Sequence, residues 1–221
     1  MGHSLEEIAR DITAALALEQ PRLSVSLIKE ELLVEGVFDL KPRKVELSYL
    51  GKLDEFSIKL ELPRTFPKGE PKLFETVGRI PHEADRHINH DGSCCFGIWE
   101  AWCASVEPVT FQKFLDGPVR DFFFGQHFYE QRKEWPYGEF KHGKDGLLQS
   151  YAEVLGCKPK VETIRYRLRL FSKTWPRGHW ECVCGSGCQI RSCCTEIYNK
   201  PPVFRKSAML MKKRFDQYFE P

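Results

Sequence analysis

The chain has 221 residues and a formal net charge of +2, and 42% of its residues are hydrophobic. This composition fits one globular domain with an appendage, or two small domains. A net charge so near zero does not by itself imply binding to nucleic acid. No apolar run approaches the roughly 20 residues that cross a bilayer as a helix. The N-terminus lacks the basic flank and apolar core of a signal peptide, so we expect a cytoplasmic protein.

The hydrophobic pattern predicts one helix followed by strands. Residues 4–19 carry apolar side chains at helical spacing, and Gln20-Pro21 ends that segment. Strand-like runs follow at residues 23–27, 32–40, 45–50 and 55–62. The last run alternates apolar and polar residues, as a half-buried antiparallel strand does.

A proline-rich crossing, a cysteine-containing loop and helices come next. Three prolines between Pro63 and Pro71 predict an extended, irregular segment. A short strand is expected at 72–80, before the loop. After it, Pro108 starts a helix that Gly117-Pro118 interrupts. Further helices are predicted at residues 119–132 and 145–155. This order predicts an α+β protein whose helices pack on an antiparallel sheet.

Nine cysteines are many for a chain of this size without a secretion signal. In a reducing compartment such residues more often bind metal or do chemistry than form disulfides. Three of them lie in the middle of the chain, Cys157 stands alone, and five crowd a short C-terminal segment. The sequence therefore points to two separate cysteine sites.

The first site is the loop His87-Ile-Asn-His-Asp-Gly-Ser-Cys-Cys-Phe96. Its Asp91-Gly92 pair predicts a tight turn, which presents the adjacent thiols of Cys94 and Cys95 near several histidines. A thiol becomes a nucleophile when a base or cation favours its thiolate. One interpretation is a covalent nucleophile. The alternatives are a buried loop cysteine and half of a metal site.

The composition changes from Cys157 onward. Fourteen lysines and arginines lie between residues 158 and 214, against three glutamates. Residues 161–171 alternate apolar side chains with Arg165, Arg167 and Arg169, which predicts a strand with a basic outer face. Such a face is most often simply solvated. An acidic partner surface or nucleic acid is the alternative.

The C-terminal cysteines have the spacing of a metal site. Cys182-Val-Cys184, a Gly-Ser-Gly turn and the pair Cys193-Cys194 can close a tetrahedral thiolate site. The glycines let the backbone wrap the ion. Disulfides are the alternative.

This segment resembles the SEC-C zinc motif, in which Cys-x-Cys-Gly-Ser-Gly leads to a Cys-Cys or Cys-His pair. The resemblance assigns zinc-ligand roles to Cys182, Cys184, Cys193 and Cys194. Cys188 stands where the motif usually has lysine, so it is either a spare thiol or a competing ligand. Four protein ligands leave no open coordination position, so we expect a structural zinc.

The predicted order of elements resembles the ubiquitin-conjugating enzyme fold over roughly residues 1–155. Thr65-Phe-Pro-Lys-Gly-Glu-Pro71 is similar to the family's tyrosine–proline segment, and Asp91-Gly-Ser-Cys-Cys-Phe96 to its Asn/Asp-Gly-x-x-Cys-Leu motif. Trp99 or Trp102 resembles the tryptophan that follows in the family. The expected fold is then a four-stranded antiparallel meander with flanking helices.

The resemblance also implies an organisation and an active site. A conjugating-enzyme-like domain would span residues 1–156, and a basic strand with the zinc-binding appendage residues 157–221. Cys95 would be the acceptor cysteine, with Cys94 as an assistant or an alternative acceptor. His87 or Asn89 would donate a hydrogen bond to the oxyanion, and His87 is alternatively a general base.

One difference from the eukaryotic family points to a particular subfamily. His87 stands where the eukaryotic family has the asparagine of His-Pro-Asn. Together with the paired cysteines, this is similar to the stand-alone conjugating proteins of CBASS antiphage operons. That subfamily implies a partner, a cGAS-like nucleotidyltransferase, whose C-terminal glycine passes through a cysteine thioester to lysine amines. An activating enzyme would be a separate protein, or would be dispensed with.

Two other functions fit the same residues. The first is a catalytically silent module with the conjugating-enzyme fold that scaffolds a ubiquitin-like partner. The second is a zinc protein that binds nucleic acid through its basic tail, although the small net charge argues against nucleic acid as the main partner. Neither a membrane nor a soluble cofactor is expected.

Overall fold

The computed structural model describes residues 5–28, 31–41, 54–106, 108–136, 141, 143–173, 177–182, 186–195 and 204–219. The chain forms two compact units. The first comprises Met1–Gly97 and Val109–Glu139, and the second Ile98–Pro108 and Phe140–Pro221. The domain boundary after residue 156, between the conjugating-enzyme-like domain and the zinc-binding appendage, stays a prediction.

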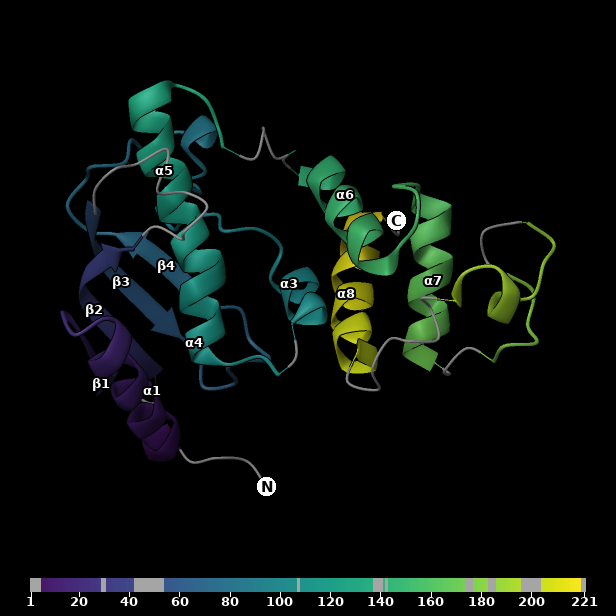
Figure 1. Cartoon of the computed structure of the whole chain (residues 1–221), viewed down its shortest axis with the longest axis horizontal. Helices are drawn as coiled ribbons and strands as arrows, with labels where there is room; N and C mark the ends of the chain where they lie inside the picture. Colours follow the sequence, from purple (N-terminus) through teal and green to yellow (C-terminus); the bar gives the residue numbers. More distant parts are fainter. Residues whose placement is uncertain are drawn as a thin grey trace. The chain divides into compact units, whose positions relative to one another are not determined.

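The first unit is an antiparallel sheet preceded by one helix (Figure 1). Helix α1, Leu5–Glu19, buries Ile12 and Leu16. Four strands follow in the order β1-β2-β3-β4, each antiparallel to its neighbour. They span Leu23–Ile28, Glu31–Leu40, Asp54–Leu62 and Lys72–Glu75. The predicted α+β class with a four-stranded antiparallel sheet is confirmed.

Two of the predicted strands have different outcomes. The strand predicted at 72–80 is the fourth strand of the sheet, and it ends at Glu75. The strand predicted at 45–50 lies outside the described residues. In the first unit, the segment between β3 and β4 carries no helix or strand, as its prolines predicted.

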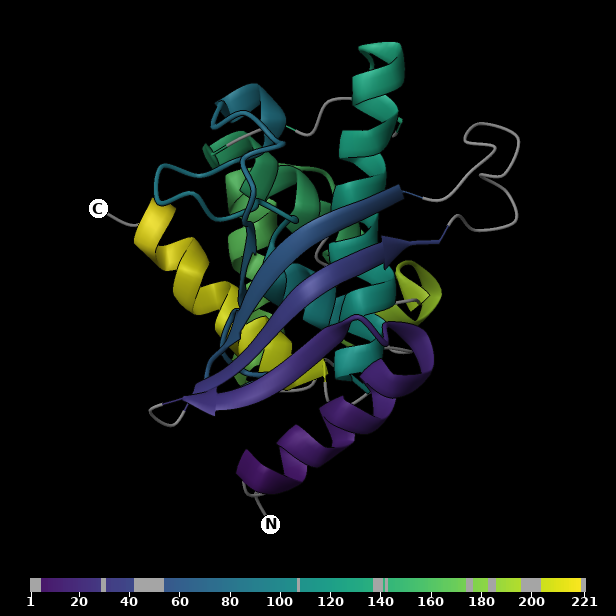
Figure 2. The same ribbon diagram turned by 90° about the vertical axis from the view of Figure 1, so that its left-hand side faces the viewer.

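One face of the sheet forms the core of this unit. Every second side chain of β3 is buried, as the alternation predicted. These side chains are Phe56, Ile58, Leu60 and Leu62. Helix α5, Arg120–Arg132, lies against this face (Figure 2). The ring of Phe123 stacks on Phe56, with 4.5 Å between centroids, and contacts Phe38 at 5.6 Å. The predicted strand and helix therefore share one aromatic core.

The helix that precedes α5 is continuous with it. Helix α4, Phe111–Phe114, runs through a π-helical turn, η3, Leu115–Val119, into α5. Thr110 caps the start of α4, because its hydroxyl accepts a hydrogen bond from the Lys113 amide. The predicted interruption at Gly117-Pro118 is this π-helical turn: the α-helix gives way there but the chain stays helical, because the wider turn accommodates Pro118, which has no amide hydrogen to donate.

The second unit is helical. Its helices lie side by side in Figure 1. They are α3 (Trp99–Ser105), α6 (Gly143–Leu155), α7 (Val161–Lys173) and α8 (Phe204–Phe219). Their core also takes in Cys182 and Ile190 of the C-terminal cysteine segment. Glu100 of α3 is buried and accepts hydrogen bonds from Tyr151 of α6, at 2.6 Å, and Arg214 of α8, at 3.1 Å. Among the described helices, none is long and apolar enough to cross a membrane.

Residues 161–171 form helix α7, so the predicted basic strand is wrong. Ile164, Leu168 and Phe171 are buried at positions i, i+4 and i+7, whereas Tyr166 is 52% exposed. The apolar residues that alternate along this segment fit a strand and a helix equally well over a short run. Its arginines are also good helix formers. Because Arg167 is buried in the core, the segment presents no continuous basic face.

Candidate functional sites

The loop with the paired cysteines is a small hairpin in the first unit. It begins after a single 3₁₀ turn, η2, Ala84–Arg86, where His87 adopts a left-handed backbone with φ 54°. Ile88 pairs with Cys94 in an antiparallel bridge, and the Cys95 amide donates to the His87 carbonyl at 2.8 Å. The predicted turn is present, with Gly92 at φ 81°. The cysteines therefore leave the turn on the second arm of the hairpin.

Polar contacts hold the tip of this hairpin. The Asp91 carboxylate accepts hydrogen bonds from the Ser93 hydroxyl, at 2.6 Å, and the Ser93 amide, at 3.1 Å. It also pairs with Lys72 at the start of β4, 2.8 Å away. Lys72 and Ser93 hold the pKa of Asp91 well below its usual range. The side-chain amide of Asn89 donates to the Ser93 hydroxyl at 3.0 Å. The hydrogen bond to Ser93 thus fixes the orientation of the Asn89 side chain, although Asn89 is exposed.

The two cysteines have opposite environments. Adjacent side chains of an extended arm point to opposite sides. Cys94 is only 3% exposed, and its amide donates to the Leu73 carbonyl of β4 at 2.7 Å. Burial raises the pKa of the Cys94 thiol to about 12, although the Glu75 backbone amide acts in the opposite direction. Cys95 is partly exposed. Cys94 is therefore a neutral core thiol at pH 7, and Cys95 is the accessible one.

The structure places the three nearby histidines differently. His87 is half-buried, and its ring meets Trp135 edge-on at 4.7 Å between centroids. It contacts Cys95 through its backbone carbonyl. The ring of His82 lies beside the turn at Gly92, and His82 and His90 are both exposed. The structure thus brings Cys95, His87 and Asn89 into one hairpin and turns Cys94 into the core.

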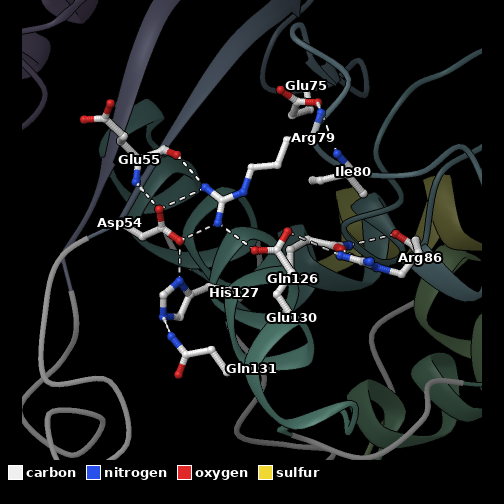
Figure 3. A network of polar contacts seen from close by, with 10 residues as sticks. All are labelled: Asp54, Glu55, Glu75, Arg79, Ile80, Arg86, Gln126, His127, Glu130 and Gln131. Atoms are coloured by element: carbon white, nitrogen blue, oxygen red, sulfur yellow. Dashed lines mark hydrogen bonds and ion pairs between the residues drawn. The ribbon is translucent and has the colours of Figure 1, made fainter.

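A polar network supports the base of the hairpin (Figure 3). Arg79, which follows β4, forms two hydrogen bonds to Asp54 of β3, at 2.7 and 2.9 Å, and pairs with Glu130 of α5 at 2.6 Å. Asp54 also contacts the imidazole of His127. Burial raises the pKa of Asp54, but the hydrogen bonds from Arg79 and His127 outweigh it and hold that pKa well below the usual range. Asp54 is thus ionised and ties β3 to α5.

Arg86 connects this network to the hairpin. Its Nε donates to Gln126 Oε1 at 2.9 Å, and Gln126 Nε2 donates back to the Arg86 carbonyl at 2.8 Å. Both residues are buried. The guanidinium also lies over the ring of Tyr129, 4.9 Å from its centroid. Because Arg86 directly precedes His87, Gln126 fixes the backbone from which the cysteine hairpin starts.

The C-terminal cysteines form a second candidate site. Residues 178–182 and 188–191 form the two arms of a short hairpin, in which the Cys182 amide donates to the Cys188 carbonyl at 2.7 Å. A 3₁₀ turn, η4, Ile190–Ser192, then leads to Cys193 and Cys194. The sulfurs of Cys182, Cys193 and Cys194 all lie within 4.8 Å of one another. Sulfurs around a tetrahedral zinc lie roughly 3.8 Å apart, so a small contraction closes this site on an ion.

Two of the predicted positions need separate mention. Cys184 lies outside the described residues. Cys188 is exposed, and its thiol contacts the Ser186 carbonyl at 3.8 Å. Within the described part of the chain, the three-sulfur group does not include Cys188. We interpret Cys188 as a hairpin residue whose backbone, through its carbonyl, orients Cys182.

No protein-family model matches the chain, and it matches neither a curated protein nor a solved structure. The functional inference therefore rests on the geometry of the two cysteine sites. The resemblances to ubiquitin-conjugating enzymes and to the SEC-C motif stay expectations drawn from sequence.

Proposed function

We propose that the protein is a ubiquitin-conjugating-like acyl carrier, in which Cys95 accepts the C-terminal glycine of a partner protein as a thioester. The observation that carries the proposal is the contrast between the adjacent cysteines, one a buried thiol and the other partly exposed on a braced hairpin. The order of helix, three strands, irregular crossing, fourth strand, cysteine hairpin and packed helix supports a ubiquitin-conjugating fold for the first unit.

The chemistry requires an activated acyl donor, either an acyl adenylate or a thioester on another protein. The Cys95 thiolate attacks the carbonyl carbon, and AMP or the donor's thiolate leaves. A neutral lysine amine then attacks the same carbon. The amide bond forms, Cys95 leaves as a thiolate, and the amine proton passes to solvent. The thioester divides one difficult acyl transfer into two easier ones.

Asn89 is the proposed oxyanion donor. A primary amide has two hydrogens. The hydrogen bond to Ser93 uses one of them and orients the group, and in the proposal the second hydrogen binds the oxyanion. One donor of this kind contributes about 10²–10³ in rate. His87 retains two roles, as the residue whose carbonyl holds the Cys95 backbone and as a candidate general base.

The remaining parts of the proposal come from the sequence resemblance. The acyl donor is a cGAS-like nucleotidyltransferase ending in glycine, the setting is cytoplasmic antiphage defence, and activation is performed by a separate protein. The metal at the C-terminal cysteines is a structural zinc, with Cys184 as the fourth ligand. Zinc bound in this way organises the local chain and takes no part in acyl transfer.

Intact mass after co-expression with the neighbouring operon proteins tests the proposal. Wild type and Cys94→Ala are expected to carry an adduct that hydroxylamine removes, and Cys95→Ala is expected to carry none. An adduct lost in Cys94→Ala and kept in Cys95→Ala would contradict the assignment of the nucleophile. A tight complex without an adduct in any variant would establish the silent binding module instead.

A further inference from the structure

Arg167 of α7 is an unusual core residue because it carries a full positive charge. It is only 2% exposed and is the bulkiest of the fully buried side chains. Its Nη1 donates to the carbonyls of Leu155 and Gly156, the latter at 2.8 Å, at the end of α6. Its Nη2 lies 3.8 Å from the sulfur of Cys194. Among the residues that the structure describes, no carboxylate pairs with this guanidinium.

A buried cation without a counter-charge is strongly disfavoured. The carbonyls at the end of a helix supply only about half of a negative charge. The remaining acceptor of Arg167 is Cys194, one of the three clustered cysteines. A metal-bound cysteine is held as a thiolate. The counter-charge that best balances the Arg167 guanidinium is therefore the thiolate cluster in its metal-loaded form.

We propose that Arg167 is the charge partner of the metal–thiolate cluster, binding the Cys194 sulfur with one arm and the end of α6 with the other. The guanidinium reduces the repulsion among the clustered thiolates and orients Cys194, as outer-sphere groups do in metal sites. It also couples metal occupancy to the packing of α6 and α7. This role is independent of any acyl chemistry at Cys95 and rests only on the three-cysteine cluster.

The geometry explains why an arginine serves here. A planar guanidinium offers five N–H donors in a fixed fork, so one side chain reaches two carbonyls and a sulfur together. Methionine at position 167 would fill a similar volume without charge or donors. Glutamine would keep amide donors for the carbonyls but carry no charge. The two variants therefore separate the charge of Arg167 from its hydrogen bonds to α6.

The test uses the full chain with cobalt as a spectroscopic probe. Thiolate-to-cobalt absorption, titrated against a competing chelator, gives the metal affinity of wild type, Arg167→Met and Arg167→Gln. Both variants are expected to bind ~10–100-fold more weakly. Arg169→Met, at an exposed position on the same helix, is the matched control and is expected to bind as wild type does.

Thermal unfolding with and without metal separates this role from simple packing. The proposal predicts that metal raises the melting temperature less in Arg167→Gln than in wild type. Equal cobalt affinity in wild type and Arg167→Gln, with equal losses of melting temperature in the metal-free and loaded forms, would overturn it. Failure of wild type to bind cobalt would also overturn it. If Arg167→Met does not fold, Arg167→Gln decides alone.

Discussion

At the residue scale, two adjacent cysteines of the same hairpin have very different chemistry. The Cys94 amide donates a hydrogen bond to the Leu73 carbonyl of β4. Burial raises the pKa of the Cys94 thiol to about 12. Cys95 lies on the other side of the same arm and is partly exposed. From the sequence alone, the two thiols cannot be distinguished. Their difference follows from the pairing of the hairpin arm with β4, which places Cys94 in the core.

The raised pKa of Cys94 predicts a loss of stability at alkaline pH. In the folded protein this thiol keeps its proton up to about pH 12, whereas an unfolded cysteine loses it near pH 8.5. Between these values the folded state binds more protons, so the free energy of unfolding falls as pH rises, by about 1.4 kcal/mol per pH unit. Urea unfolding at several pH values measures this slope.

Cys94→Ala, which removes the thiol, tests whether Cys94 causes this pH dependence of the free energy of unfolding. The variant is expected to be less stable than wild type near neutral pH, because it leaves a small cavity. Its stability should also fall less steeply above pH 9. Parallel curves for the two proteins would contradict the burial of the Cys94 thiol.

At the element scale, the position of the hairpin depends on helix α5. Gln126 is fully buried on a helix whose neighbouring side chains are mostly aromatic, and it bonds both the guanidinium and the carbonyl of Arg86. The sequence offered one signal, a glutamine within an apolar helical run. It could not name the partner, because Arg86 lies 40 residues away in the chain.

Replacing Gln126 tests whether α5 positions the hairpin. Gln126→Leu keeps the size but leaves the Arg86 carbonyl and Nε without their buried hydrogen-bond partner, which costs about 1–3 kcal/mol in the free energy of unfolding. We also expect faster alkylation of Cys94, because the hairpin opens more often. Urea unfolding and mass-resolved alkylation measure the two effects.

The control for this variant is Arg132→Leu, at an exposed position on the same helix. It is expected to change the free energy of unfolding by less than about 0.5 kcal/mol. The positioning role of Gln126 would be contradicted if Gln126→Leu left the alkylation of Cys94 unchanged under conditions where the protein stays folded.

At the scale of the whole molecule, each compact unit has its own cysteine site. The hairpin with Cys95 belongs to the sheet unit, and the three-sulfur cluster belongs to the helical unit. Cys182 is also a member of the helical unit's apolar core. A metal ion at the cluster is therefore expected to stabilise helices α6, α7 and α8 and to leave the sheet unaffected.

Metal removal tests this separation. Metal binding to structural thiolate sites contributes up to about 10–16 kcal/mol, so chelation should speed hydrogen exchange in α6, α7 and α8. Amides of β2 and β3 should keep their protection. Uniform loss of protection in both units would contradict the separation. The natural control is Cys188→Ala, which should retain one metal ion per chain, whereas Cys193→Ala should lose it.

Much of this architecture follows from patterns that are local in the sequence. The alternation from Phe56 to Leu62 predicts β3, and Asp91-Gly92 predicts the turn. The apolar residues of helix α7 also alternate as in a strand, and the exposure of Tyr166 together with the burial of Arg167 distinguishes the helix from the predicted strand. The Gln126–Arg86 pair and the Arg167–Cys194 contact join distant segments, so no local pattern predicts them.

The central claim is that Cys95 carries the acyl group, and trapping that group tests it most directly. A serine nucleophile forms an oxygen ester, which is more stable than a thioester. Cys95→Ser and Cys94→Ser are therefore co-expressed with the operon partners, digested and mapped by mass spectrometry. The account predicts a hydroxylamine-resistant ester at position 95 in Cys95→Ser, and only a labile thioester at Cys95 in Cys94→Ser. An ester trapped at position 94, with an intact Cys95 that carries nothing, would contradict it.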